Sequence, residues 1–111
     1  MRAGTRLQHG ERSFDPRLSA KETIVLNLLS GGEPLYGLQL VALSEGRLKR
    51  GTVYVTLGRM EAKGYVVSAA DVETSTAGRL PRRLYRPTPL GLRVATAWST
   101  LMQTLRLAEE A

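Results

Sequence analysis

The hydrophobic period of this chain changes at Gly64, and this change restricts the fold more than any other feature. Before it, Val53, Leu57 and Met60 recur at the i, i+4, i+7 spacing of an amphipathic helix. After it, residues 65–70 begin with aromatic and β-branched side chains, which predicts a strand. A chain of 111 residues argues for one domain, so this helix and this strand must share one small core.

Capping and turn residues divide the rest of the chain. Ser19 and Glu22 form a capping box that opens a helix, and Gly31-Gly32 ends it. Thr88 caps a last helix that has Pro89 at its first position. The predicted elements are a helix between Ser19 and Gly31, a helix from about Leu35 to Glu45, a helix from Gly51 or Thr52 to Gly64, a strand from Tyr65 to Ala70, a strand that ends at Pro87, and a helix from Pro89 to about Glu110.

This order of elements predicts a mainly α fold of the α+β class, a winged helix-turn-helix in which the β-hairpin is the wing. We expect three regions. A loose N-terminal arm at 1–18 docks Phe14 and Leu18 on the body, the winged helix-turn-helix domain occupies 19–88, and a long C-terminal dimerisation helix occupies 89–111.

The chain lacks the residues that several classes of function require. It has no Cys, and its one histidine, His9, lies in the arm, so no metal site and no catalytic histidine are expected. No Ser-His-Asp set, phosphate loop or pair of catalytic carboxylates appears. No apolar run approaches the ~20 residues of a membrane span, and the N-terminus lacks the apolar stretch of a signal peptide. We therefore expect a cytoplasmic protein that is not an enzyme, has no cofactor and does not bind a membrane.

The charge of the chain indicates a polyanionic partner. The formal net charge is +6, which favours nucleic acid or an anionic membrane surface. Nine of the sixteen Lys and Arg residues lie in the segments 47–63 and 79–86, which a winged helix turns toward DNA. Because scattered charge is what a solvated surface shows, clustering by element favours DNA.

The outer face of the third predicted helix has an unusual composition. Opposite the core positions lie Thr52, Val55, Gly58, Arg59 and Ala62, with Tyr54 and Thr56 beside them. An interior Gly costs a helix roughly 1 kcal/mol against Ala. Small residues let a helix lie deep in the major groove, where an Arg reaches guanine or phosphate and a Val meets a thymine methyl. The alternative is that Gly58 packs against another protein helix.

Three stretches resemble the PadR family of bacterial transcriptional regulators: LYGLQL at 35–40, GTVYVTLGRMEAKGYVVS at 51–68 and GRLPRRLYRPTPLG at 78–91. The family's motifs match Tyr36-Gly37, Gly51-Thr52-Val53-Tyr54, Leu57-Gly58-Arg59-Met60-Glu61, Gly78-Arg79 and Leu84-Tyr85-Arg86-Pro87-Thr88. The resemblance covers roughly residues 19–100. It implies a homodimeric winged helix-turn-helix repressor, with Tyr36, Thr52 and Tyr54 near the DNA backbone and the dimer contact on the C-terminal helix.

The chain departs from the family's pattern at several places. Val55 replaces the usual Pro, Leu84 replaces a wing Tyr, and the first wing strand lacks the Trp often found there. The C-terminal part is short, so the larger effector domain of many members is not expected. These departures affect ligand binding more than DNA binding.

The candidate DNA-contacting residues come from the outer helix face, the basic segments and the resemblance. Arg59 is expected to carry base specificity, and the wing arginines to contact phosphates or the adjacent minor groove. Glu61 is expected to be a structural partner of a nearby Lys or Arg. The full set is Tyr36, Lys49, Arg50, Thr52, Tyr54, Val55, Thr56, Arg59, Lys63, Arg79, Arg82 and Arg83.

The last predicted helix carries an apolar stripe that one small domain cannot cover. We expect an isologous homodimer through this stripe, whereas the alternative is a helix that packs back onto the first one. Trp98 is placed near the two-fold axis, where an incompletely closed interface would bind a planar apolar effector; the alternative is a well-packed Trp with no slot. The predicted interface residues are Val94, Trp98, Leu101, Met102, Leu105 and Ala108.

The sequence therefore predicts a dimeric, sequence-specific DNA-binding transcriptional regulator that represses neighbouring genes from an imperfect inverted repeat. Two alternatives remain open. One is a basic RNA-associated protein, and the other is a protein-interaction module without specific DNA binding, which leaves the basic segments unexplained.

Overall fold

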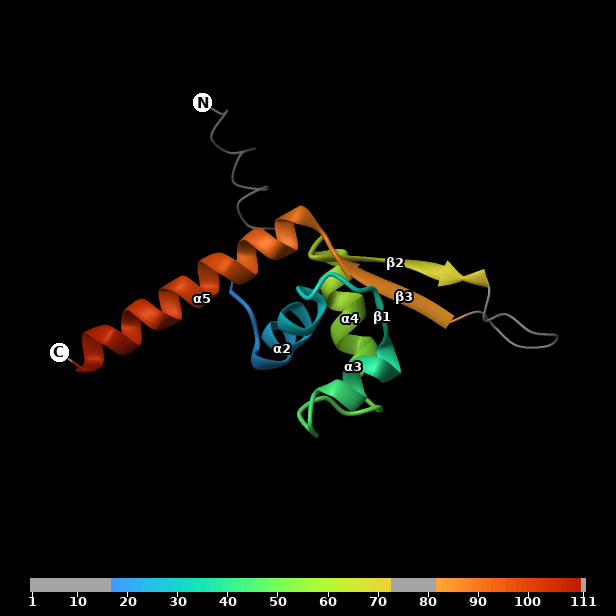
Figure 1. The fold of residues 1–111 in the computed structure, drawn as a ribbon, viewed down its shortest axis with the longest axis horizontal. Helices are drawn as coiled ribbons and strands as arrows, with labels where there is room; N and C mark the ends of the chain where they lie inside the picture. The colour runs from blue at the N-terminus through green and yellow to red at the C-terminus, as the bar shows by residue number, and fades with distance from the viewer. Residues whose placement is uncertain (1–16, 73–81, 111) are drawn as a thin grey trace, which may run out of the picture.

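A computed structural model describes residues 17–72 and 82–110 of the chain. Within these residues the elements are α2 (Ala20–Leu29), β1 (Leu35–Tyr36), α3 (Gly37–Leu43), α4 (Val53–Ala62), β2 (Val66–Asp71), β3 (Arg82–Pro87) and α5 (Pro89–Glu110). The predicted winged helix-turn-helix is confirmed. Helices α2, α3 and α4 form the body, β2 and β3 extend from it as the wing, and α5 projects in the opposite direction (Figure 1).

The sheet contains a strand that the sequence pattern did not indicate. The second helix was expected from Leu35, but Leu35 and Tyr36 form β1, and α3 begins only at Gly37. Strand β1 pairs antiparallel with β3 through Leu35 with Tyr85 and Tyr36 with Leu84, so the strand order is β1-β3-β2. The pairing with β3, some fifty residues away, is stronger than the local preference of this segment for helix, because it satisfies backbone groups that would otherwise be unpaired.

One hydrophobic core joins the three short helices to the sheet. The face predicted from the helical period is confirmed, because Val53, Leu57 and Met60 are all buried. Leu18, which was expected to dock on the body, is also buried, while Phe14 and the rest of the predicted arm lie outside the described residues. The fully buried side chains come from the three body helices, from the α3–α4 and α4–β2 connections and from β2: Val25, Leu26, Leu29, Leu40, Ser44, Leu48, Val53, Leu57, Met60, Tyr65 and Val66.

The predicted cap at Thr88 is confirmed and fixes the direction of α5. The Thr88 hydroxyl accepts a hydrogen bond from the Gly91 N–H at 2.9 Å and donates one to the Gly64 carbonyl at 2.5 Å. The Thr88 N–H donates to the Tyr65 carbonyl at 3.0 Å. Since Gly64 and Tyr65 form the turn between α4 and β2, the start of α5 is attached to that turn.

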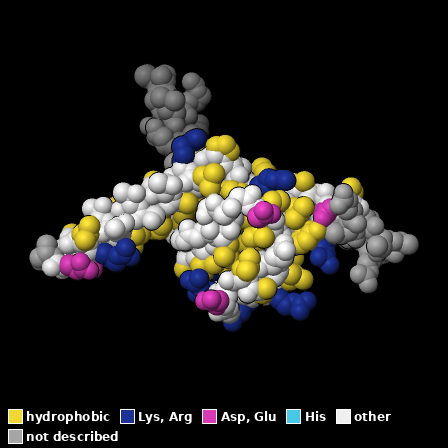
Figure 2. All heavy atoms as spheres, viewed as in Figure 1, with side chains coloured by type: hydrophobic (Ala, Val, Ile, Leu, Met, Phe, Trp, Pro, Cys, Tyr) yellow, Lys and Arg dark blue, Asp and Glu magenta, His cyan; other side chains and the backbone are white. Residues whose placement is uncertain are grey.

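The described part of the chain leaves the second half of α5 mostly uncovered. Residues 99–110 are exposed throughout, and this part of the helix runs past α2 into open space (Figures 1 and 2). In residues 17–72 and 82–110, no helix has the length and apolar character needed to cross a membrane.

Candidate nucleic-acid interface

The side of α4 that faces away from the core is open. Tyr54 and Val55 are 51% and 55% exposed, and Gly58, Arg59 and Ala62 are exposed as well. A Cβ placed on Gly58 would have no described neighbour within 4 Å. Packing against another helix of the described chain therefore does not explain Gly58, and this face is free to contact a partner.

Thr56 does not belong to this open face. The sequence analysis placed it beside the outer residues, but it is only 8% exposed. It follows Val53 by three positions and precedes Met60 by four, and this spacing places it on the core side of the helix. The expectation that Thr56 is available to DNA is therefore wrong for this structure.

Basic side chains surround the N-terminal end of α4. Lys49 and Arg50 are exposed in the turn between α3 and α4. Thr52 is exposed next to them, and its hydroxyl accepts a hydrogen bond from Lys21 Nζ at 3.5 Å. Figure 2 shows Lys and Arg side chains along the lower edge of the molecule, where α3 and α4 lie in Figure 1. Positively charged side chains therefore lie around the first turn of α4.

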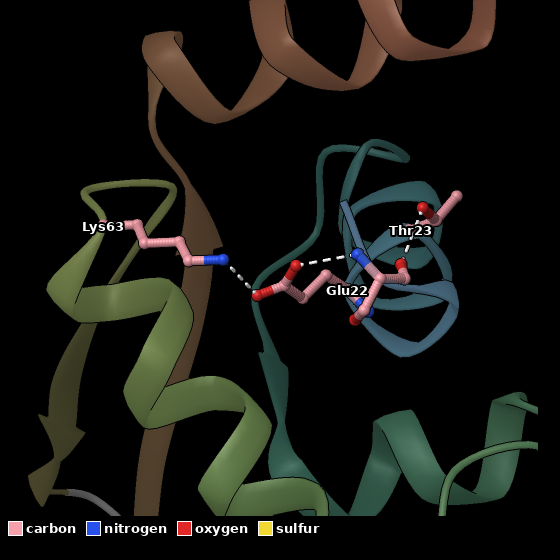
Figure 3. A network of polar contacts seen from close by, with 4 residues as sticks. Glu22, Thr23 and Lys63 are labelled. Atoms are coloured by element: carbon pink, nitrogen blue, oxygen red, sulfur yellow. Dashed lines mark hydrogen bonds and ion pairs between the residues drawn. The ribbon is translucent and has the colours of Figure 1, made fainter. Parts of the chain in front are cut away.

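Lys63, at the other end of α4, makes an intramolecular contact. Its Nζ lies 2.9 Å from Oε2 of Glu22, which is buried at the start of α2 (Figure 3). The other carboxylate oxygen of Glu22 accepts a hydrogen bond from the Ser19 N–H at 2.9 Å, which completes the predicted capping box. Burial raises the pKa of Glu22, but Lys63 and Ser19 together outweigh it and leave the pKa below its ordinary value.

At the end of β2 and β3 that is farther from α4 and α5, Tyr36 holds two charged side chains. Its hydroxyl donates a hydrogen bond to the carboxylate of Asp71, and the guanidinium of Arg82 lies 4.9 Å from the centre of its ring. Asp71 and Arg82 are direct partners across strands β2 and β3. Tyr36 therefore connects β1 to the wing, and Asp71 is a functional candidate that the sequence analysis missed.

Arg83 is held in place by a second series of hydrogen bonds. Its Nε donates to the Ser68 hydroxyl oxygen at 3.0 Å, and that hydroxyl donates to Oε2 of Glu61 at 2.7 Å. The predicted structural role of Glu61 thus operates through Ser68 rather than through a direct ion pair. Arg79, the remaining wing arginine of the predicted set, lies outside the described residues.

A cavity of about 370 Å³ lies between the start of α3, the start of α4 and strand β3. It brings together four predicted residues, Tyr36, Tyr54, Arg82 and Arg83, with Tyr85, which the sequence analysis did not include. Gly37 permits this arrangement, since a Cβ there would lie 2.5 Å from the Tyr54 ring. Only the pairing of β1 with β3 brings these groups together, so no local pattern identifies the cavity.

The predicted interface residues on α5 divide into two groups. Val94 is buried in the chain's own core, so the expectation that it needs a partner subunit is wrong, whereas Trp98 packs only partly against that core. Leu101, Met102 and Leu105 remain 47%, 40% and 48% exposed, and Ala108 is exposed. Among the described residues, no group of three or more His, Cys, Asp or Glu side chains could hold a metal ion.

The sequence model of the "Transcriptional regulator PadR-like family" matches residues 25–97, which include the second half of α2, the described sheet, α3, α4 and the first part of α5. Among curated proteins we find no match. A PadR family transcriptional regulator from Eggerthella lenta DSM 2243 has a similar structure, with 32% sequence identity and a TM-score of 0.64. The alignment covers 79% of each chain.

Two more distant structures share the fold. A MarR family transcription regulator is 22% identical with a TM-score of 0.67, and the alignment covers 86% of this chain and 59% of that one. PadR of Bacillus subtilis, in complex with operator DNA, is 14% identical with a TM-score of 0.64, and the alignment covers 86% of this chain and 62% of that one. This chain therefore spans less than two thirds of the length of either protein.

Proposed function

This chain belongs to the PadR-like family of transcriptional regulators, and from this premise we propose that it is a homodimeric repressor that binds a specific DNA operator. Residues 19–88 bind the DNA, and residues 89–111 hold the two subunits together. The observation that carries the proposal is the open face of α4, which has no packing role in the described chain and is surrounded by basic side chains.

On DNA, α4 enters the major groove with its small residues toward the bases. Gly58 and Ala62 let the helix backbone approach closely, Val55 meets a thymine methyl, and Arg59 hydrogen-bonds guanine or contacts a phosphate. Lys49 and Arg50 lie where they reach the backbone beside the groove. Bacillus subtilis PadR, which has the same fold, was solved in complex with operator DNA, and this supports an operator as the partner.

Dimerisation follows from the exposed half of α5. The stripe formed by Leu101, Met102, Leu105 and Ala108 is apolar and solvent-exposed. A helical segment as short as residues 99–110 is only marginally stable in water on its own, so a partner helix has to stabilise it. A two-fold dimer places two α4 helices about 34–36 Å apart, which requires an imperfect inverted repeat in the operator.

An effector site beside Trp98 is a further part of this proposal. A cavity of about 190 Å³ adjoins Trp98 and Met102 on α5 and Thr23 and Asn27 on α2. This volume is smaller than the 300–1,000 Å³ of typical ligand sites, so the second subunit would have to complete a slot for a planar apolar effector. If the subunits close fully around Trp98, the ring is a packing residue and no slot exists.

Binding of duplex DNA tests the proposal directly. The protein should bind a short duplex from its own upstream region more tightly than random duplex DNA and structured RNA of equal length, with a strong dependence on salt. Sedimentation at the same concentrations should show a dimer. Equal affinity for structured RNA, or a monomer that protects single half-sites, would contradict the proposal.

A further inference from the structure

Tyr85 is a buried residue with an unsatisfied hydroxyl group. It lies in β3 and is only 6% exposed, yet within residues 17–72 and 82–110 its hydroxyl has no hydrogen-bond partner. Buried polar groups in native proteins nearly always have a partner, and an unpaired one costs about 1–3 kcal/mol. The hydroxyl of Tyr85 therefore calls for a partner that the described residues do not supply.

The cavity described above is where such a partner would bind. Tyr85 lines it together with Tyr36, Tyr54, Arg82 and Arg83. Its volume of about 370 Å³ falls within the range of small-molecule binding sites. Since Tyr54 stands at the start of α4, the cavity adjoins the face that we propose enters the major groove.

The charged groups of the cavity suit an anion. The Arg82 guanidinium is held over the Tyr36 ring, and Arg83 is held by the hydroxyl and the carbonyl of Ser68. Both side chains are thus oriented before a ligand arrives, and Arg83 keeps N–H donors that no described group accepts. Among the described residues, no Asp or Glu lines the cavity. The two nearby carboxylates are engaged within the chain, Asp71 by the Tyr36 hydroxyl and Glu61 by the Ser68 hydroxyl.

The phenol of Tyr85 is a donor near neutral pH. Burial raises its pKa, the neighbouring Glu61 and Tyr54 raise it further, and Arg83 lowers it in part. On balance the pKa of Tyr85 is raised, so the hydroxyl keeps its proton at the near-neutral pH of DNA binding. A protonated phenol beside the Arg83 guanidinium can donate a hydrogen bond to an oxyanion that the guanidinium also binds.

We propose that this cavity binds a phosphate oxyanion, and that on DNA its occupant is one backbone phosphodiester, which accepts hydrogen bonds from the Tyr85 hydroxyl and from Arg83. The inference rests on the proposed DNA-binding function and adds Tyr85 to it. The deoxyribose next to the phosphate packs against the rings of Tyr36 and Tyr54. A free phosphate ester has the same oxyanion chemistry, so the test has to separate these two sources.

The variant Tyr85→Phe removes only the hydroxyl oxygen. We expect the free protein to be as stable as wild type or more stable, because an unsatisfied group is lost. We expect about tenfold weaker binding to operator and random duplexes alike, with an unchanged salt slope, since no charge is removed. Arg83→Gln should instead lower the salt slope by about 1. Tyr65→Phe, at a buried tyrosine outside the cavity, is the matched control and should leave DNA binding unchanged.

A scan with single methylphosphonates in the operator duplex identifies the phosphate. At one position, and at its symmetry mate, the neutral linkage should weaken binding by the wild-type protein about tenfold. The same linkage should not weaken binding by Tyr85→Phe any further, because that variant has already lost the hydrogen bond. In parallel, phenyl phosphate is titrated into the free protein at constant ionic strength and followed by NMR.

The possible outcomes distinguish failure of the phosphate site from failure of DNA binding. Coupling at one methylphosphonate assigns the site to DNA. Additive effects at every position, with phenyl phosphate shifting cavity resonances in wild type but not in Tyr85→Phe, assign it to a free phosphate ester. Additive effects without phenyl phosphate binding overturn the oxyanion site. If wild type does not bind duplex DNA at all, the proposed function fails, and the phenyl phosphate arm alone decides on the cavity.

Discussion

Lys63 at the C-terminal end of α4 and Glu22 in the first turn of α2 form an ion pair with an Nζ–Oε2 distance of 2.9 Å, although they are 41 positions apart in the sequence. The carboxylate of Glu22 is buried, whereas the Lys63 side chain is about a third exposed. The pair therefore fixes the C-terminal end of α4 to the start of α2.

Replacement of Lys63 by Met should destabilise the fold, because the buried carboxylate of Glu22 loses its cationic partner. We expect a loss of about 1–3 kcal/mol in free energy of unfolding at pH 7, measured by urea denaturation. Lys49→Met, at an exposed lysine in the α3–α4 turn, is the control and should change stability little. Equal losses in the two variants would contradict a stabilising role for the pair.

The same pair should make stability depend on acid pH. The pKa of Glu22 is lower in the folded chain than its ordinary value of about 4.3, so its contribution is complete above that value. As pH falls through the lower folded pKa, the carboxylate is protonated and the contribution is lost. The stability difference between wild type and Lys63→Met should therefore be present at pH 7 and shrink below about pH 4. A difference that stays constant down to pH 3 would show that Glu22 does not carry it.

Gly91→Ala should be strongly destabilising. A Cβ on Gly91 would overlap the carbonyl oxygen of Tyr65 and lie 2.9 Å from its carbonyl carbon, and both are backbone atoms that cannot move aside easily. We expect a cost of about 3 kcal/mol or more, seen as a lower melting temperature. Gly31→Ala is the control, because its Cβ would meet only the Leu28 carbonyl at an ordinary 3.8 Å.

Gly58→Ala separates helix stability from groove binding. The site is open in the described chain, so Ala should stabilise α4 by up to about 1 kcal/mol. If α4 lies deep in the major groove, the added methyl should at the same time weaken operator binding, as measured by fluorescence anisotropy. A variant that is more stable and binds the operator as well as wild type would rule out close approach at Gly58.

Arg59→Ala should change specificity more than general affinity. Arg59 is exposed on the open face of α4, so its loss should cost about 1–3 kcal/mol on the operator and little on random DNA. Arg82→Ala, in the wing, should weaken both DNAs alike and lower the salt slope by about 1. Equal losses on both DNAs for Arg59→Ala would reject its assignment to base recognition.

Leu105→Glu should separate the subunits, because it places a charge in the middle of the proposed apolar stripe. Sedimentation should show monomers at micromolar concentration, and operator binding should fall, since the two half-sites are no longer engaged together. Leu107→Glu is the control, because Leu107 is also exposed, at 60% against 48% for Leu105, but lies off the stripe. A dimer that persists in Leu105→Glu would place the contact elsewhere.

Trp98 fluorescence reports on the same interface. Trp98→Ala should move the protein toward monomer, and dilution of wild type into the dissociating range should shift the Trp98 emission to the red. Because Trp98 already packs partly on its own subunit, the shift should be partial. An emission maximum that does not change while the dimers separate would place the ring in the monomer core and remove the reason to expect an effector there.

The sequence alone predicted the local features of this fold. The capping box at Ser19, the cap at Thr88 and the buried face of α4 each depend on residues within one or two helical turns, so their spacing predicts them. The end of β3 at Pro87 and the bounds of α5 match for the same reason. The open face of α4 followed from that spacing too, apart from Thr56, which lies near the boundary between the two faces.

The tertiary structure decided which polar side chains remain available. Lys63 and Tyr36 were assigned to DNA from charge and resemblance, but Glu22 and Asp71, 41 and 35 positions away, bind them within the chain. Strand β1 exists only because β3 pairs with it, and that pairing also forms the cavity around Tyr85. A one-dimensional pattern specifies which face of an element is apolar. It does not specify which charges meet when elements pack, because that depends on distances across the fold.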